Sequence, residues 1–215
     1  ISKEIYDLHM LIFFICVATG VGVFGVMFYA MFKFRKSKGA VAQHWHENIT
    51  VEVAWTVVPF VILIAMAVPA TGTLKKMYNT DEADVLIQVT GYQWKWRYQY
   101  LDPDTEGIDF FSSLSTDRDQ IANKTEQKNG NYLLEVDNPL VIPVNKKVRF
   151  LITANDVIHS WFVPAFAIKK DAIPGYINEM SVVINEPGIY RGRCAELCGR
   201  HHGFMPIVIK AVEEK

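Results

Sequence analysis

The chain lacks any marked excess of charge. Its 22 Lys and Arg residues nearly balance its 23 Asp and Glu residues, leaving a formal net charge of -1 at pH 7. Hydrophobic residues make up 50% of the chain, so it fits neither a nucleic-acid-binding protein, which needs a basic surface, nor a disordered chain, which is poor in apolar residues. The motif Cys-x-x-Cys-His is also absent, so these residues have no attachment site for a c-type haem.

Two long stretches, residues 8–32 and 53–74, contain no Asp, Glu, Lys or Arg. As helices, each is long enough to cross roughly 30 Å of hydrocarbon. A buried helix pair in a soluble core fits poorly, because only about 140 residues remain to cover two helices that are apolar all round. A cleaved signal peptide does not fit the first stretch, whose apolar run is too long and whose flanking charge is wrong. We predict a two-helix transmembrane hairpin within residues 1–78.

The connection between the two spans is strongly basic, with Lys33, Arg35, Lys36 and Lys38. By the positive-inside rule this connection faces the cytoplasm. Both termini, and everything after the second span, are therefore expected on the outer side. That side is the periplasm for a bacterial inner membrane, or the intermembrane space for a mitochondrial inner membrane.

Residues 79–215 have the composition of a water-exposed β domain. Turn dipeptides such as Asn129-Gly130 and Pro187-Gly188 separate short runs with strand character, and no long amphipathic helix is evident. This pattern predicts a sandwich or barrel. The expected strands are 84–91, 93–100, 132–136, 147–153, 158–163, 179–184, 189–193 and 205–212.

A short loop near the C-terminus is dense in metal-binding side chains. Cys194, Glu196, Cys198, His202 and Met205 lie within twelve residues. Soft thiolate and thioether donors combined with imidazole favour copper over magnesium, calcium or manganese, and a structural zinc site has little use for a methionine. A disulfide between the two cysteines would suit an oxidising compartment, but it would leave the other donors unexplained.

A loop alone cannot enclose a metal, so a distant ligand is needed. His159 interrupts an apolar, strand-like run and is the candidate. His201 is expected to point away from its neighbour His202, toward solvent or the surroundings of the site. Cys16 lies in the first span, far from the other thiols, and is expected to be a packing residue.

His159 together with the 194–205 loop resembles the binuclear copper A site in subunit II of haem-copper cytochrome c oxidases. The likeness extends to Asp171-Ala-Ile-Pro-Gly175 and to the N-terminal half. It implies a cupredoxin-like Greek-key fold for the β domain. It also implies that Cys194 and Cys198 bridge two copper ions, that His159 and His202 each bind one, and that Met205 and the backbone carbonyl of Glu196 complete the coordination.

The resemblance assigns further roles outside the copper loop. Trp94 would accept the electron from cytochrome c, whereas the neighbouring Lys95 departs from the aromatic residue more usual there. Glu52, at the start of the second span, would help to admit protons to a channel in subunit I. The side chain of Glu196 would reach a magnesium ion at the border with subunit I, and Asp156 would help to dock cytochrome c. Asp171 is a weaker candidate for the surroundings of the site or for an interface.

The segment 101–137 contains nine acidic residues against three basic ones. Such a run is usually only a solvated face, but an acidic surface would also steer a basic electron donor, with binding that weakens as salt rises. Which of these carboxylates take part is left open.

We therefore expect the electron-accepting subunit of a cytochrome c oxidase. It would pass electrons to haem in subunit I, where oxygen is reduced to water and protons are pumped. The alternatives are a membrane-anchored mononuclear cupredoxin outside any oxidase, a quinol oxidase subunit, a nitrous oxide reductase and a structural zinc module. A mononuclear site needs one thiolate rather than two, and a quinol oxidase subunit would lack the ligands. Nitrous oxide reductase is not expected to have a hairpin anchor.

Overall fold

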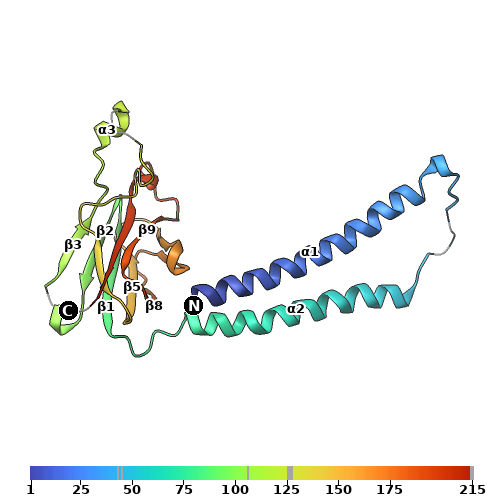
Figure 1. Ribbon diagram of the computed structural model, residues 1–215, viewed down its shortest axis with the longest axis horizontal. Coiled ribbons are helices and arrows are strands. Elements are labelled where there is room, and N and C mark those ends of the chain that lie inside the picture. The colour runs from blue at the N-terminus through green and yellow to red at the C-terminus, as the bar shows by residue number, and fades with distance from the viewer. Residues whose placement is uncertain (43, 45, 106, 125–127, 214–215) are drawn as a thin grey trace. The chain divides into compact units, whose positions relative to one another are not determined.

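The computed structural model describes residues 1–215 except 43, 45, 106, 125–127 and 214–215. The chain forms two compact units, one comprising Lys3–Lys75 and the other Lys76–Lys215. The first is helical and the second is built from β-strands (Figure 1).

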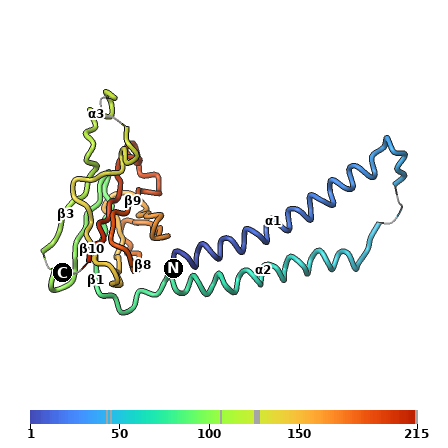
Figure 2. The backbone as a smooth tube through the Cα atoms, in the orientation of Figure 1, coloured from blue at the N-terminus to red at the C-terminus, as the bar shows by residue number. Residues whose placement is uncertain are grey.

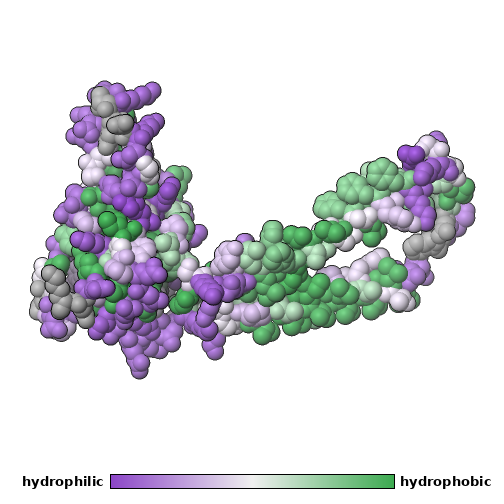
Figure 3. Space-filling view, viewed as in Figure 1, coloured by the Kyte–Doolittle hydropathy of each residue, from purple (hydrophilic) through white to green (hydrophobic). Residues whose placement is uncertain are grey.

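Two long helices make up the first unit. Helices α1 (Ser2–Lys33) and α2 (Ile49–Met77) run in opposite directions as a hairpin (Figures 1 and 2). Neither has a buried residue, and in the space-filling view their surface is largely hydrophobic (Figure 3). By length and composition both are able to cross a membrane. Each is longer than its expected span because charged and polar residues at the ends continue the helix.

The second unit is a sandwich of two five-stranded sheets (Figures 1 and 2). All neighbouring strands pair antiparallel except β1 (Val85–Tyr92) with β5 (Lys147–Ala154) and β4 (Leu140–Pro143) with β10 (Pro206–Val212), which pair in parallel. The first sheet, in spatial order, contains β3 (Asp109–Ser112), β2 (Lys95–Tyr100), β1 (Val85–Tyr92), β5 (Lys147–Ala154) and β8 (Asn178–Val183). The second contains β4 (Leu140–Pro143), β10 (Pro206–Val212), β9 (Gly188–Cys194), β6 (His159–Val163) and β7 (Ile168–Ala172).

The core lies between the two sheets and is rich in aromatic side chains. Every second residue of β5 is buried, as expected for a strand with one face on a core. Phe150 of the first sheet packs against Trp161 of the second, with ring centroids 4.8 Å apart. Trp96 and Tyr98 are fully buried beside them. Burying each such ring stabilises the fold by roughly 2–3 kcal/mol.

The expected hairpin and β sandwich are confirmed, but the strand assignment needs corrections. The strand expected at 132–136 is wrong: residues 131–133 form a turn, and only Val136 makes an isolated bridge, to Leu114. The sequence reading missed β3, β4, β7 and the short helix α3 (Arg118–Asn123). These elements are only four to six residues long, too short for a clear periodic pattern.

Candidate metal centre

Three connections between strands meet at one end of the sandwich. The β1–β2 turn carries Trp94, the β5–β6 connection carries Asp156, and the β9–β10 connection carries Cys198. Hydrogen bonds tie them together: the backbone N–H of Gln93 donates to Asp156 at 2.7 Å, and the indole Nε1 of Trp94 donates to the carbonyl oxygen of Cys198 at 3.1 Å.

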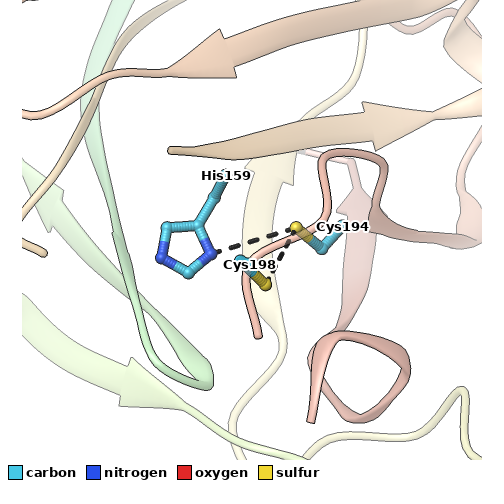
Figure 4. A group of neighbouring side chains, drawn as sticks. All are labelled: His159, Cys194 and Cys198. Atoms are coloured by element: carbon cyan, nitrogen blue, oxygen red, sulfur yellow. Dashed lines mark hydrogen bonds between the residues drawn. The ribbon is translucent and has the colours of Figure 1, made fainter. Parts of the chain in front are cut away.

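The strand pairing brings together residues that are far apart in sequence. Trp161 of β6 lies opposite Cys194, the last residue of β9. His159 begins β6, so this register places its imidazole near the Cys194 sulfur (Figure 4). The ligand atoms of His159, Cys194 and Cys198 all lie within 4.8 Å of one another, and all three residues are buried.

The two sulfurs are not joined. Cys194 Sγ and Cys198 Sγ are 3.8 Å apart, far beyond the roughly 2.05 Å of a disulfide bond. Thiolates at this separation can both reach a cation between them at roughly 2.3 Å, an ordinary thiolate–metal distance. The remaining thiol, Cys16, lies in α1 and is exposed.

The other expected donors also face the sulfurs. Cys198 Sγ lies 3.5 Å from both His202 Nδ1 and Met205 Sδ. On the opposite side, Cys194 Sγ lies 3.3 Å from the backbone oxygen of Glu196 and 3.9 Å from His159 Nδ1. The structure thus brings all six expected copper ligands into one cluster. Its pattern of one imidazole per sulfur, with a thioether and a carbonyl at the flanks, fits a pair of soft metal ions bridged by the thiolates.

The His159 ring is held from two sides. Its Nε2 lies 2.8 Å from Asp156 Oδ1, which leaves Nδ1 directed at Cys194. A metal-binding histidine commonly uses its second ring nitrogen in this way, with a carboxylate fixing its orientation. The other side is a close approach to Gly91, where a Cβ would lie 2.8 Å from His159 Cδ2. Only glycine leaves room for the ring.

Burial and mutual contacts shift the pKa values of the ligand side chains. Burial lowers the pKa of His159, but the contacts with Cys194 and Asp156 outweigh burial and leave the pKa raised. Burial and the negative charge on Cys194 raise the pKa of Cys198 to about 12. For Cys194, hydrogen bonds from His159 and the backbone outweigh burial and lower the pKa. A bound cation would favour the deprotonated form of both thiols, because a metal binds the thiolate.

Trp94 lies directly against the 194–205 loop. Its indole and the Gln93 amide both donate to the Cys198 carbonyl, and its ring meets the imidazole of His201 edge-on, with centroids 4.6 Å apart. Gly199 lets the side chains of Gln93 and Trp94 approach the loop this closely. Its φ is +112°, and a Cβ there would lie 3.0 Å from the Gln93 side chain. The His201 ring also lies near that of Phe204, with centroids 5.8 Å apart. Partial desolvation, followed by the charges of Arg118 and Arg200, lowers the pKa of His201.

Sequence reasoning missed the contact between Asp156 and His159. Asp156, for which the resemblance predicts a docking role, accepts hydrogen bonds from the backbone N–H groups of Gln93 and Val157, and its carboxylate also faces the imidazole. The three-residue spacing to His159, across a turn, is the signal that could have indicated this contact. Asp171, the weaker candidate, accepts a hydrogen bond from Ser160 Oγ at 2.7 Å.

Many carboxylates of the acidic segment have partners within the chain. Asp109 pairs with Arg97, and Glu135 pairs with Arg191. Asp102, Asp117 and Asp137 accept hydrogen bonds from backbone N–H groups. Glu106 and Glu126 lie outside the described residues. Among the carboxylates that the structure describes in this segment, Asp104 and Asp119 are left without such a side-chain contact.

The last two expected side chains are exposed. Glu52 lies in the first turn of α2, where its Oε1 is 3.4 Å from the backbone N of Asn48. The Glu196 side chain points outward while its carbonyl faces Cys194. Neither carboxylate belongs to the group of potential metal-binding side chains formed by His159, Cys194 and Cys198.

Comparison with known families gives matches over most of the chain. The model described as "Cytochrome C oxidase subunit II, periplasmic domain" matches residues 85–212, and "Cytochrome C oxidase subunit II, transmembrane domain" matches residues 1–72.

Curated relatives match along the whole chain. A "Probable cytochrome c oxidase subunit 2" of Rickettsia bellii is 42% identical over 215 residues, covering 100% of this chain and 77% of the relative. The Rickettsia prowazekii protein of the same name is 41% identical, and this chain spans 66% of its length. "Cytochrome c oxidase subunit 2" of Arabidopsis thaliana is 37% identical, with 100% of this chain and 82% of the relative covered.

A solved structure resembles the β domain. The periplasmic domain of subunit II of cytochrome oxidase from Bradyrhizobium japonicum is 42% identical, with a TM-score of 0.54. The match covers 63% of this chain and 88% of that domain.

Proposed function

Because the chain belongs to the cytochrome c oxidase subunit II family, we propose that its β domain binds two copper ions and accepts electrons for an oxidase complex. The observation that carries the proposal is the cluster of six donors around two unjoined sulfurs. When bound, the copper pair supplies a one-electron carrier whose charge is spread over both thiolates. Electrons would come from cytochrome c and pass to haem in subunit I, where oxygen is reduced and protons are pumped.

The protein's own contribution is to hold the donors still. The β6–β9 pairing fixes His159 against Cys194, and Asp156 fixes the imidazole ring. Cys194, Cys198 and Met205 are at most 3% exposed, so water is excluded from the sulfurs. A buried and rigid ligand set changes little when the charge changes, which favours fast electron transfer, and the groups around the ligands tune the potential.

Trp94 is the proposed electron acceptor at the surface. Its indole is half-buried and donates a hydrogen bond to the carbonyl oxygen of Cys198, whose sulfur is one of the proposed ligands. An electron reaching this ring is one hydrogen bond away from the copper loop. The same geometry supports an outward-facing domain, since a water-soluble donor has to reach Trp94.

The remaining roles are inferred from membership of the family. The two helices would anchor the chain in a bacterial or mitochondrial inner membrane, with the basic connection in the cytoplasm or matrix and the β domain outside. Glu52 would help to admit protons to subunit I. Glu196 would bind magnesium through its side chain at the border with subunit I, while its carbonyl faces copper.

A mononuclear cupredoxin carrier outside an oxidase is not favoured. Such a site uses one thiolate, whereas here both Cys194 and Cys198 have an imidazole within 4 Å of the sulfur. The fold and the family point to an oxidase subunit instead.

Metal analysis of the assembled complex tests the proposal. We expect two copper ions per chain beyond those of the partner subunits, and a purple, mixed-valence absorption that Cys198→Ser abolishes. Tyr176→Ser, at an exposed residue outside the cluster, is the control and should leave the absorption unchanged. One copper with a blue spectrum, or zinc in place of copper, would contradict the binuclear site.

A further inference from the structure

Trp96 of β2 is a core residue that contacts the ligand cluster. Its side chain is fully buried, so the indole N–H cannot reach water and needs an acceptor within the protein. That acceptor is the backbone oxygen of Met205, 3.3 Å from Trp96 Nε1. Met205 is the last residue of the 194–205 loop before β10 begins at Pro206. The bond therefore holds the main chain at the point where the loop returns to the sheet.

The same indole also contacts a second expected ligand. The ring centroids of Trp96 and His159 are 5.9 Å apart, and their planes are inclined at 63°. Gly91 lies opposite Trp96 in the pairing of β1 with β2, and residues paired across two strands share a face of the sheet. A Cβ at Gly91 would lie 2.8 Å from His159 Cδ2. The missing side chain thus leaves room for the imidazole beside the indole.

These two contacts connect Trp96 to both halves of the proposed copper pair. His159 Nδ1 faces the sulfur of Cys194, whereas Met205 Sδ faces the sulfur of Cys198. In the proposed centre, each half therefore has one of its ligands against the same buried ring. A change at Trp96 can then reach either copper ion without touching a ligand directly.

The two halves depend on Trp96 to different degrees. The His159 ring has a second support in Asp156, whose Oδ1 lies 2.8 Å from Nε2. The thioether of Met205 ends a flexible side chain with three rotatable bonds, so its distance from a metal depends on where its main chain is held. An axial thioether is a ligand that tunes the potential of a copper–thiolate site. Loss of the indole N–H is therefore expected to affect the Met205 half first.

We propose that Trp96 is a positioning residue that sets the reduction potential of the copper pair by holding the Met205 main chain. The inference rests on the proposed function, because it concerns how that copper centre is tuned. With the bond in place, the thioether is kept as a donor to the oxidised, more positively charged state. A thioether that moves away stabilises this state less, so the potential rises.

The test is a redox titration of the copper absorption in the assembled oxidase. Trp96→Phe keeps an aromatic ring near His159 but removes the N–H that bonds to Met205. We expect the equilibrium constant for one-electron reduction of the copper pair to rise about threefold, which is about 28 mV at 59 mV per factor of ten. The copper hyperfine splitting in the electron paramagnetic resonance spectrum should show less equal sharing of the unpaired electron between the two nuclei.

Phe150→Leu is the matched control. Phe150 is a fully buried ring of the same core and packs against Trp161, which is not one of the expected ligands. Both substitutions should lower the temperature of thermal unfolding, but Phe150→Leu should leave the potential and the hyperfine splitting unchanged. If Trp96→Phe does not fold, Trp96→Met supplies a flexible apolar side chain without a donor, and the same rise in potential is expected.

A double-mutant cycle tests whether Trp96 acts through Met205. Met205→Leu removes the thioether, which is the group that the indole is proposed to hold in place. Adding Trp96→Phe to Met205→Leu should then shift the potential by less than it does in the unaltered chain, because residues in contact give non-additive effects. Equal shifts in the two backgrounds would show that Trp96 acts by another route and would overturn the proposal.

Two further results would overturn it. They are an unchanged potential in a Trp96→Phe complex that retains its full copper content, and an equal shift in Phe150→Leu. Failure of the proposed function looks different, because the unaltered complex would then lack the copper pair and its absorption.

Discussion

At the scale of single residues, the site depends on side chains that fix others in place. Asp156 and Gly91 hold the His159 ring, and Gln93 and Trp94 both bond to the Cys198 carbonyl. The donors themselves stand out in the sequence because cysteine, histidine and methionine rarely gather in one loop. The supporting residues carry no such signal, since a carboxylate or a glycine is common anywhere.

Replacing Asp156 should weaken copper binding. Asp156→Asn keeps the size of the side chain but removes the negative charge that faces His159. Loss of such a supporting carboxylate lowers metal affinity by roughly 10–100-fold, which a chelator competition followed by copper absorption would measure. Asp119→Asn is the control. If copper affinity holds and only KM for the donor rises, Asp156 has the docking role predicted from sequence.

Replacing Trp94 should slow electron transfer into copper more than it weakens donor binding. Trp94→Phe keeps an aromatic ring but removes the indole N–H that bonds to the Cys198 carbonyl at 3.1 Å. We expect transfer about tenfold slower, equivalent to about 1.4 kcal/mol in the barrier, measured by stopped-flow reduction of copper. Equal losses in rate and affinity would point to docking instead.

Tyr98 makes stability fall at alkaline pH. Burial raises the pKa of this fully buried phenol, although the hydrogen bond from Trp161 acts against the shift. An unfolded tyrosine ionises above about pH 10, where the folded one keeps its proton. The stabilising contribution is therefore complete below about pH 10 and is lost as pH rises further, by up to about 1.4 kcal/mol per pH unit.

Tyr98→Phe should remove this alkaline loss. At pH 7 the variant should be about 1 kcal/mol less stable, because the Trp161 indole N–H loses its acceptor. Its free energy of unfolding should then fall less steeply than that of the parent between pH 9 and 11, as denaturant titrations would show. Tyr176→Phe, at an exposed tyrosine, serves as the control. If the free energy of unfolding fell with the same slope in the parent and both variants, Tyr98 would not be the cause of the alkaline loss.

At the scale of secondary structure, the pairing of β6 with β9 builds the site. It joins a histidine and a cysteine that are 35 residues apart. The long elements could be predicted because charge-free runs and alternating strands leave a clear pattern. The short elements could not: β7 contains Lys169, Lys170 and Asp171 in succession, and such a run reads as a loop. The register that brings His159 to Cys194 depends on contacts across the sheet, which one sequence does not reveal.

Gly192 is the position where this pairing tolerates least change. A Cβ there would lie 2.1 Å from the backbone oxygen of Phe162 on β6. Gly192→Ala should force the strands apart, destabilise the domain by about 3 kcal/mol or more and reduce copper occupancy. Gly203→Ala, where a Cβ meets nothing within 4 Å, is the control. Thermal unfolding and metal content measure both, and equal behaviour of the two variants would show that β9 can shift without loss.

At the scale of the whole molecule, the two units are expected to serve different halves of the reaction. The β domain would handle electrons outside the membrane, and the helical hairpin would anchor it and help to supply protons. If each unit has its own role, a substitution in one unit should leave the role of the other unit unchanged. Glu52 allows this test because it lies in the first turn of α2, far along the chain from every copper donor.

Glu52→Gln should therefore slow proton-coupled turnover and leave the copper centre intact. The substitution keeps an oxygen near the Asn48 backbone N–H but removes the ionisable group that a proton path requires. We expect steady-state oxygen consumption to fall on the order of tenfold, with unchanged copper absorption and unchanged copper reduction by the donor. Glu47→Gln, at an exposed carboxylate just before α2, should leave turnover unaltered. Full turnover in Glu52→Gln would confine this subunit to electron transfer, with protons supplied by other chains.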